Sequence, residues 1–329
     1  MEKATLAKTM KAVVYYKYGS TDELQFKEVA TPLPKDSEVL IKVQAATVNR
    51  TDCGFLEAEY FAVRLFTGLF RPKMPILGSE FAGDIVAIGK EVSSFKVGEA
   101  VFGLSGRHFG AHAAYLCMPE DGSIALKPQN MSYEQAAAVC EGAYLAMNYY
   151  KTVDLQGKHK ILINGATGSI GSAGVQLAKY FGADITAVGN TKNLDLVKSL
   201  GANNVMDYQK EDFTKLNDSF DFIFDAVGKS SFFKSKHLLK HGGIYFSTEL
   251  GFAYVNPILA LLGLKFDGKK VIFPIPKINK ADVLFFKQRI EEGHYKAVID
   301  RIYPFEHIVD AYKYVQTGQK TGNVVIKMD

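Results

Sequence analysis

The sequence is poor in cysteine, and the three cysteines it has are far apart. Cys53, Cys117 and Cys140 are odd in number and form neither a disulfide framework nor a C-x-x-C metal motif. This scarcity excludes the small, disulfide-stapled secreted folds and is typical of a reducing compartment. We therefore expect a cytoplasmic protein.

Strong charge and long apolar segments are also missing. The net charge is only +4, from 39 basic and 35 acidic residues, and the basic residues form no cluster, which argues against a nucleic-acid partner. Residues Met1–Thr9 contain lysines but no apolar core after them, so they do not resemble a signal peptide. The most apolar segment, Val255–Leu264, is far shorter than the roughly 20 residues that cross a bilayer. We expect no stable membrane insertion, and a buried helix or an oligomer contact is favoured for this segment over peripheral membrane contact.

What the chain does contain is a glycine-rich turn in a specific context. An apolar strand, Lys160–Asn164, leads directly into this turn, and an amphipathic helix, Ser172–Tyr180, follows it. Glycines remove the side chains that would keep a phosphate away from backbone N–H groups and a helix N-terminus. A lone G-x-x-G-x-x-G pattern is weak, but the strand before it and the helix after it make it a strong signal for dinucleotide binding. The predicted contacts are Gly165, Ala166, Thr167, Gly168, Ser169, Ile170 and Gly171.

The end of the next predicted strand, Asp184–Val188, lacks a carboxylate. In NAD-binding folds an Asp or Glu usually accepts a hydrogen bond from the ribose 2′-hydroxyl at this point. Here the chain continues as Gly-Asn-Thr-Lys-Asn, which offers neutral donors and a positive charge and therefore suits a 2′-phosphate. The alternative is an ordinary capped helix with a solvated lysine. We predict NADPH as the cofactor, with Gly189, Asn190 and Lys192 among its contacts.

The order of predicted elements indicates an α/β protein. Short strands and turns fill the first third of the chain, and this pattern changes at Ser132, where a helix begins. Strands and helices then alternate, with helices expected at Ser230–Leu239 and Lys280–Glu292 and a sixth strand at Val271–Pro274. Such alternation implies right-handed crossovers and a doubly wound parallel sheet. A chain of 329 residues suits two domains of ordinary size.

Six landmarks resemble one family in their order and spacing. They are Met10-Lys-Ala-Val-Val, Val48-Asn-Arg-Thr-Asp52, Gly78-Ser-Glu-Phe-Ala-Gly83, the glycine turn, Asp225-Ala-Val-Gly228 and Gly318-Gln-Lys-Thr-Gly-Asn323. The chain thereby resembles the medium-chain dehydrogenase/reductase superfamily, in particular its zinc-independent quinone oxidoreductase (zeta-crystallin-like) branch. The resemblance implies a GroES-like β domain, residues 1–131 with 282–329, and a Rossmann NADP-binding domain, residues 132–281, with the active site between them. Family habit also implies a homodimer through the edge of the Rossmann sheet near Val271–Pro274.

The resemblance bears on metal content as well. Zinc-dependent members carry Cys and His where this chain has Asn49 and Ser79, and an amide and a hydroxyl are poor replacements for a thiolate and an imidazole. The four-cysteine structural zinc lobe is missing too. His108 and His112 have H-x-x-x-H spacing, but the glycines around them argue against the helix that would bring them together. We expect no bound metal.

These features favour reduction over alcohol oxidation. Without zinc, the Lewis acid that stabilises an alkoxide is absent, whereas a quinone or an α,β-unsaturated carbonyl accepts hydride at carbon while charge moves to oxygen. We predict an NADPH-dependent reductase of such small electrophilic substrates. The alternatives are an enoyl or enone reductase with little quinone activity, and a non-catalytic NADPH-binding regulatory protein.

The resemblance implies three catalytic candidates, each with a structural alternative. Asn49 could donate to a substrate carbonyl or cap a turn or helix. Tyr60 could orient a ring substrate, donate a proton, or simply pack. Glu141 lies near Leu145, which replaces a threonine that contacts the nicotinamide ribose in the family; it either binds the ribose or substrate, or caps a helix.

Further cofactor contacts are implied at later strand ends and in a return loop. Tyr208 resembles a tyrosine that packs near the 2′-phosphate, and Val227 and Thr248 follow strands at the expected ligand edge of the sheet. Asn323 belongs to a loop that resembles one reaching the cofactor from the first domain. Plain loop chemistry is the alternative for each.

Overall fold

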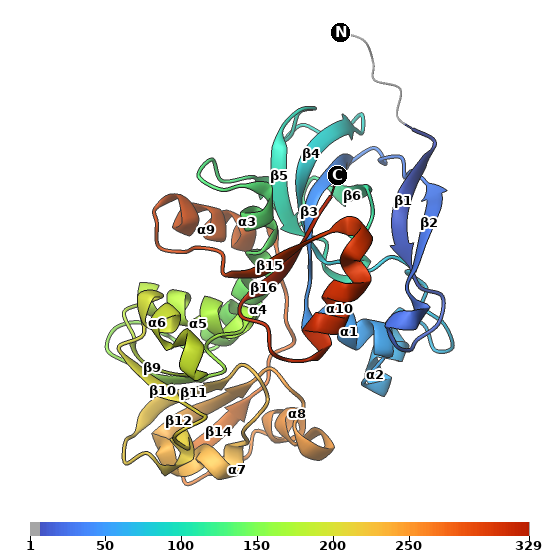
Figure 1. Ribbon diagram of the computed structural model, residues 1–329. Coiled ribbons are helices and arrows are strands. Elements are labelled where there is room, and N and C mark those ends of the chain that lie inside the picture. The colour runs from blue at the N-terminus through green and yellow to red at the C-terminus, as the bar shows by residue number, and fades with distance from the viewer. Residues whose placement is uncertain (1–6, 329) are drawn as a thin grey trace. The chain divides into compact units, whose positions relative to one another are not determined.

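The computed structural model describes residues 7–328 and divides the chain into two compact units (Figure 1). The first unit contains the residues up to Cys140 together with those from Ile278 onward, and the second contains Glu141–Lys277. The boundaries expected from the sequence lie at residues 131/132 and 281/282, so the helix that follows Ser132 falls in the first unit and not in the second.

Helix α3 (Tyr133–Ala137) belongs to the first unit because of its contacts there. Ser132 and Gln135 form a capping box, in which Ser132 Oγ accepts from Gln135 N at 3.3 Å and Gln135 Oε1 accepts from Ser132 N at 3.0 Å. The Tyr133 hydroxyl donates to Asp84 Oδ1 at 2.5 Å. The local signal therefore sets where the helix starts, and the tertiary contact sets which unit holds it.

The first unit is built on a mostly antiparallel sheet around one long strand. Among the described residues it has seven strands: β15 (Ile299–Pro304), β16 (Asn323–Lys327), β3 (Glu38–Val48), β4 (Glu80–Ile88), β5 (Ala100–Leu104) and β7 (Ile124–Leu126) in that order, with β6 (Tyr115–Pro119) paired to β3. A separate hairpin is formed by β1 (Thr9–Val14) and β2 (Gln25–Ala30). The helices are α1 (Arg50–Glu57), α2 (Phe61–Thr67), α3, α9 (Lys280–Glu291) and α10 (Ile308–Gln316).

The second unit is built on a sheet in which six of the seven described strands run parallel. Their order is β10 (Asn204–Asp207), β9 (Asp184–Gly189), β8 (Lys160–Asn164), β11 (Phe220–Asp225), β12 (Leu239–Ser247) and β14 (Lys269–Ile272), with β13 (Lys265–Phe266) antiparallel at the edge. The strand order reverses beside β8, which is the doubly wound arrangement predicted from the alternation of elements. Ile161, Leu162 and Ile163 of β8 are all fully buried, as expected where helices cover both faces.

Five helices accompany this sheet. They are α4 (Cys140–Tyr150), α5 (Ser169–Tyr180), α6 (Leu194–Ser199), α7 (Phe232–Ser235) and α8 (Val255–Leu261). On the strand side of α8, Leu259 packs into a core cluster with Tyr245 and Val271. Across residues 7–328, no helix combines the length and the apolar character needed to cross a bilayer.

Three local expectations are wrong. The sequence suggests that Glu57–Pro75 is one long apolar loop, but this segment contains helix α2. The helix expected over Ser230–Leu239 is reduced to α7 and one 3-10 turn because β12 begins at Leu239. The sixth parallel strand ends at Ile272 and is joined to β13 by a hairpin. Its turn residues, Asp267 and Gly268, have φ values of +53° and +79°, the conformation that two-residue hairpin turns require.

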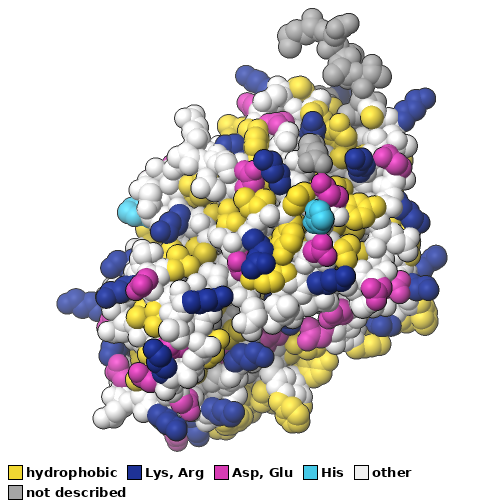
Figure 2. All heavy atoms as spheres, in the orientation of Figure 1, with side chains coloured by type: hydrophobic (Ala, Val, Ile, Leu, Met, Phe, Trp, Pro, Cys, Tyr) yellow, Lys and Arg dark blue, Asp and Glu magenta, His cyan; other side chains and the backbone are white. Residues whose placement is uncertain are grey.

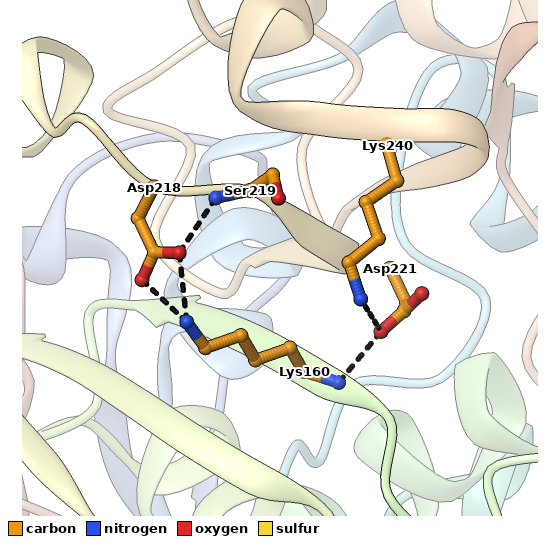
Figure 3. Close-up of polar contacts among 5 residues, drawn as sticks. All are labelled: Lys160, Asp218, Ser219, Asp221 and Lys240. Atoms are coloured by element: carbon orange, nitrogen blue, oxygen red, sulfur yellow. Dashed lines mark hydrogen bonds and ion pairs between the residues drawn. The ribbon is translucent and has the colours of Figure 1, made fainter.

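Ion pairs and hydrogen bonds connect neighbouring strands at the amino end of the parallel sheet (Figure 3). Lys160 Nζ donates to both oxygens of Asp218 at 2.7 Å, and its backbone N–H donates to Asp221 Oδ2 at 2.8 Å. Lys240 Nζ reaches the same Asp221 oxygen at 2.8 Å. The network thus ties the starts of β8, β11 and β12 together at the protein surface.

Candidate active site

The predicted glycine turn lies at the opposite, carboxyl end of the sheet. Strand β8 ends at Asn164, and the N–H groups of Gly165 and Ala166 both donate to the Val188 carbonyl, at 3.2 and 3.0 Å. Gly165 has φ +80°, a left-handed conformation that favours glycine. The turn therefore bends sharply over the end of β9 before α5 begins.

Gly171 lies where no side chain fits. A Cβ at this position would lie 2.1 Å from the Gly165 carbonyl oxygen and 2.8 Å from Ala166 Cα. Both neighbours are backbone atoms, which cannot rotate away. The close approach of the first turn of α5 to the glycine loop thus depends on this glycine.

Polar groups at the start of α5 lack hydrogen-bond partners among the described residues. Its N-cap residue is Gly168, which has no side chain and makes no capping bond. Ser169 Oγ is buried and has no hydrogen-bond partner among the described residues. Since a buried unpaired polar atom costs about 1–3 kcal/mol, and a helix N-terminus favours an anion, this end of α5 fits a phosphate group.

The predicted contacts at the end of β9 lie next to one another. The backbone N–H of Tyr208 donates to the Gly189 carbonyl at 3.0 Å, which places Tyr208 beside Gly189 and Asn190. Asn190 Oδ1 is buried without a hydrogen-bond partner in the described part of the chain. Lys192 is exposed in the 3-10 turn that follows. The Asn190 amide oxygen can accept from a ribose hydroxyl, and the exposed Lys192 ammonium can pair with the phosphate on that ribose.

A carboxylate that sequence reasoning missed lies beside this group. Asp207 ends β10 directly opposite Gly189. It accepts hydrogen bonds from the Thr191 hydroxyl and from Gln209 N at 3.0 Å, and the Thr191 bond holds the pKa of Asp207 below its usual range. The position of Asp207 at a strand end was the available signal. Because Asp207 is already paired with protein donors, its charge is partly offset.

Asp225, at the end of β11, accepts several hydrogen bonds at this end of the sheet. Its carboxylate is fully buried and accepts from Asn164 Nδ2 at 3.0 Å, Ser230 N at 2.9 Å and the Tyr245 hydroxyl at 3.1 Å. Burial and this carboxylate raise the pKa of Tyr245, so the phenol keeps its proton and donates. Asp225 thereby fixes the loops that carry two predicted contacts: Thr248 N donates to the Asp225 carbonyl at 3.1 Å, and Val227 N to Asp225 Oδ1 at 3.4 Å.

In the first unit, Asn49 lies in a buried polar cluster. Its Nδ2 donates to Glu80 Oε2 at 2.8 Å and to Thr47 Oγ1 at 3.1 Å, while its Oδ1 accepts from Lys320 Nζ at 3.4 Å. Glu80 accepts only, so the amide nitrogen has to face it. Both hydrogens of the amide are therefore engaged, and Asn49 orders its neighbours as well as preceding α1 as its N-cap residue.

Sequence reasoning missed two charged members of this cluster. Glu80 is fully buried and also accepts from the Thr47 hydroxyl at 2.7 Å. Lys320 is partly buried and donates to the Gly322 carbonyl at 2.5 Å. Both belong to quoted landmarks, Gly78–Gly83 and Gly318–Asn323, but only the pairing of distant strands shows that they meet at Asn49.

Asn323 lies next to Asn49 across neighbouring strands. Val324 of β16 pairs with Val48 of β3, so the residues beyond this pair, Asn323 and Asn49, are adjacent. Asn323 Nδ2 donates to the carbonyls of Ala138 and Val298, at 3.0 and 3.1 Å. Its Oδ1 is buried and finds no partner within the described residues. The structure thus brings these two predicted residues together.

Tyr60 and Glu141 are less defined by their contacts. Tyr60 is half-buried at the N-cap position of α2. Glu141 is buried in the first turn of α4, where a carboxylate interacts favourably with the helix dipole. Both placements fit the structural alternatives, and the catalytic roles of Tyr60 and Glu141 stay predictions.

The positions compared with zinc ligands hold no metal-binding set. Ser79 is buried beside the Glu80 cluster, and no group of three or more His, Cys, Asp and Glu side chains arranged for a metal occurs in the described residues. His108 ends a 3-10 turn, whereas His112 is buried and bonds the Thr47 carbonyl at 2.8 Å and the Tyr312 hydroxyl at 3.2 Å. Burial lowers the pKa of His112 to about 4, so it is neutral and structural.

Known proteins resemble both units. Residues 35–129 match a family described as alcohol dehydrogenase GroES-like domain, and residues 200–326 match one described as zinc-binding dehydrogenase. Over 331 residues the chain is 35% identical to 2-methylene-furan-3-one reductase of Solanum lycopersicum, which covers 96% of this chain and 79% of that protein. It is 34% identical to the chloroplastic NADPH-dependent alkenal/one oxidoreductase of Arabidopsis thaliana, with 98% and 81% covered. The solved quinone oxidoreductase from Coxiella burnetii has the same fold, with a TM-score of 0.87 at 24% identity and 98% and 100% covered.

Proposed function

Because the chain belongs to the medium-chain dehydrogenase/reductase superfamily, as an oxidoreductase related to quinone and alkenal reductases, we propose that it reduces an activated alkene or a quinone with NADPH. The fold class is confirmed: one unit is GroES-like and the other is a Rossmann-type doubly wound sheet. Members of this family use a nicotinamide dinucleotide. That the cofactor here is NADPH, with its 2′-phosphate, and not NADH is our proposal.

The observation that carries the proposal is a pair of buried polar atoms without partners at one end of the sheet. Ser169 Oγ and Asn190 Oδ1 both lie at the carboxyl end, beside a turn where Gly171 leaves room for nothing but backbone. In this position a dinucleotide would satisfy both atoms, with phosphate at the start of α5 and ribose at Asn190. Lys192 and Tyr208 would then hold the 2′-phosphate.

When bound, the cofactor supplies a hydride to the electron-poor carbon of the acceptor. Negative charge then develops on the acceptor oxygen, where the protein has to stabilise it, and a proton from water or a side chain completes the saturated product. We assign Asn49 to positioning, because donation to substrate would cost it a bond to Glu80 or Thr47. Lys320 is the cation held against Asn49 Oδ1, at 3.4 Å, and we assign it to stabilising the developing charge.

The acceptor class is supported by surface character and by the relatives' names. Helix α2 and the residues after it expose several large apolar side chains, Phe61, Leu65, Leu69 and Phe70, which favours an apolar acceptor. The two relatives at 35% and 34% identity are named for a methylene-furanone and for alkenals or alkenones, whereas a chloroplastic quinone-oxidoreductase homolog of Spinacia oleracea is 31% identical. We therefore favour a C=C bond conjugated to a carbonyl over a quinone.

The test is NADPH oxidation against matched panels of 2-alkenals, cyclic enones and quinones, with the saturated product identified. We expect turnover with the enals and enones and weaker turnover with quinones. Turnover with quinones and with neither enals nor enones would show that the acceptor is a quinone and not a conjugated C=C bond. Tight NADPH binding with no turnover in any panel would support the regulatory alternative and overturn the enzymatic proposal.

Metal independence and location stay predictions with their own tests. Activity that survives chelation, with no stoichiometric zinc by elemental analysis, would support the assignment of Asn49 and Ser79 as non-ligands. Stoichiometric zinc would contradict it. A cytoplasmic location is checked by cell fractionation, and the chloroplastic names of some relatives make this test informative.

A further inference from the structure

Helix α8 is apolar on both of its faces, yet only one face is covered. Leu259 is buried in the core cluster of the second unit, while Ile258, Leu261 and Leu262 recur at i, i+3 and i+4 on the opposite face and are exposed. Leu261 is 87% exposed. The apolar side of a surface helix normally faces a core, but in α8 the covered side carries Asn256 and Leu259 while the more apolar side is exposed, so this exposed side is expected to have a partner. Figure 2 shows hydrophobic side chains at the surface along the lower edge of the view, where α8 lies in Figure 1.

The turn that leads into α8 displays one more apolar side chain at a conformational cost. Phe252 is 94% exposed, and the residues around it, Gly251, Ala253 and Tyr254, have φ values of +73°, +51° and +60°. For residues other than glycine this left-handed conformation costs about 1 kcal/mol each. A strained turn that presents a phenylalanine to water is characteristic of a binding surface.

Lysines without acidic partners surround this apolar surface. Lys265 and Lys270 lie directly opposite one another in the β13–β14 hairpin, an arrangement of like charges that destabilises the pair. Lys236 lies over the Phe266 ring, at 5.9 Å, and Lys269 is paired opposite Phe266. None of these four forms an ion pair with another described residue.

The expectation that the basic residues form no cluster is wrong for this part of the chain, where positive charge is concentrated. Between Lys229 and Lys277 there are eight lysines and only two carboxylates, so this stretch alone exceeds the net charge of the whole protein, which is +4. The lysines are Lys229, Lys234, Lys236, Lys240, Lys265, Lys269, Lys270 and Lys277, and the carboxylates are Glu249 and Asp267.

We propose that the α8 surface, defined by Phe252, Ile258, Leu261, Leu262 and the flanking Lys236, Lys265, Lys269 and Lys270, docks onto an anionic lipid bilayer. Exposed leucines and a phenylalanine enter the headgroup boundary while lysines meet the lipid phosphates. The protein lies on the bilayer and does not cross it. For a reductase of apolar acceptors, this would place the enzyme where such molecules partition.

Charge argues for a lipid partner over a second copy of the chain. The sequence favours an edge-to-edge homodimer near β14, and a two-fold axis there would bring the same positive surface of both copies together. Lys265 on the edge strand β13 opposes such pairing. An anionic bilayer removes the like-charge problem, and α8 supplies the apolar area.

The experiment is co-sedimentation of the full chain with vesicles of phosphatidylcholine alone and of phosphatidylcholine with phosphatidylglycerol. We expect binding only to the anionic vesicles, weakened by high salt. Lys265→Gln with Lys269→Gln should lower the partition coefficient on the order of tenfold, and Leu261→Ser with Leu262→Ser should lower it at least as much.

The control variants remove two positive charges or one exposed leucine elsewhere. Lys158→Gln with Lys198→Gln and, separately, Leu33→Ser change exposed residues that do not belong to the α8 surface and should leave binding unchanged. Equal binding to both vesicle types, or equal losses in the controls, would overturn the proposal. A dimer in sedimentation velocity that is lost in the leucine double variant, without vesicle binding, would assign the surface to a second copy.

Discussion

The two ends of the parallel sheet in the second unit differ in how fully their polar groups are satisfied, although the amino end also holds one buried atom without a partner among the described residues, His159 Nδ1. At the amino end, Lys160 and Lys240 satisfy Asp218 and Asp221 at the surface. At the carboxyl end, Asp225 is fully buried and accepts several hydrogen bonds. Beside it, two other buried polar atoms, Ser169 Oγ and Asn190 Oδ1, are left unsatisfied by the described residues.

This difference distinguishes polar groups that stabilise the fold from polar groups that are available to bind a ligand. Both ends belong to the same strands, so the loops that follow and precede the strands account for the contrast. Exposed ion pairs contribute little and can be replaced, whereas a buried polar atom without a partner is a cost that folding alone does not recover. The carboxyl end carries more of this cost, with Ser169 Oγ and Asn190 Oδ1 against His159 Nδ1 at the amino end, which agrees with our proposal that the cofactor binds there.

The largest effect is expected for Gly171→Ala at the carboxyl end. The new Cβ would meet the Gly165 carbonyl oxygen at 2.1 Å, so the loop has to move, at a cost of about 3 kcal/mol. NADPH affinity should fall about a hundredfold, a loss that corresponds to roughly 3 kcal/mol. Urea unfolding and calorimetric titration measure the two losses.

The control is Gly157→Ala in the turn before β8. Gly157 has φ +74° but no atom within 4 Å of an added Cβ, so only conformational strain of about 1 kcal/mol is expected, with NADPH affinity unchanged. A similar affinity loss in both variants would remove the special role of the glycine loop.

The next effect compares one aspartate from each end. Asp225→Asn replaces an oxygen acceptor with a donor among buried donors and should lower the free energy of unfolding by about 3 kcal/mol. Asp218→Asn at the amino end should cost about 0.5 kcal/mol because its ion pair is exposed. Both are measured by denaturant unfolding, and equal costs would mean that the two ends do not differ in kind.

A smaller effect concerns a lysine from each end. Lys192→Ala should weaken NADPH binding about tenfold, or about 1.4 kcal/mol, and leave NADH binding unchanged, since only NADPH carries the 2′-phosphate. Lys240→Ala at the amino end should change neither affinity. Fluorescence titration with both nucleotides is sufficient, and an equal loss for NADPH and NADH would contradict the assignment of Lys192.

The smallest effect is the acid response of the amino end. The Lys160 ammonium holds the pKa of Asp218 below its usual range, so the stabilisation is present above about pH 4 and is lost as pH falls through the lower, folded value. Lys160→Met should therefore be slightly less stable than the native chain at neutral pH, by about 0.5 kcal/mol. Urea unfolding at neutral pH and at about pH 3 should show this difference disappearing.

Local patterns were sufficient for much of the fold, including the elements on both sides of the glycine turn. The strand before the glycine turn, the helix after it and the missing carboxylate at Gly189 could be predicted because each depends on neighbouring residues. Asp225, Glu80 and Lys320 could not, because their importance lies in partners from distant strands. Helix α2 was missed for a related reason: its exposed apolar side chains follow no amphipathic pattern.

The position of β16 between β15 and β3 has a consequence for how the chain is made. This strand pairs with β3 and β15, so the sheet of the first unit is completed only when residues Asn323–Lys327 have left the ribosome. The second unit, by contrast, is encoded without interruption and can finish folding earlier. During synthesis β3 is therefore paired with β4 and β6 first, and its segment Ala45–Val48 lacks its β16 neighbour until Asn323–Lys327 have been made.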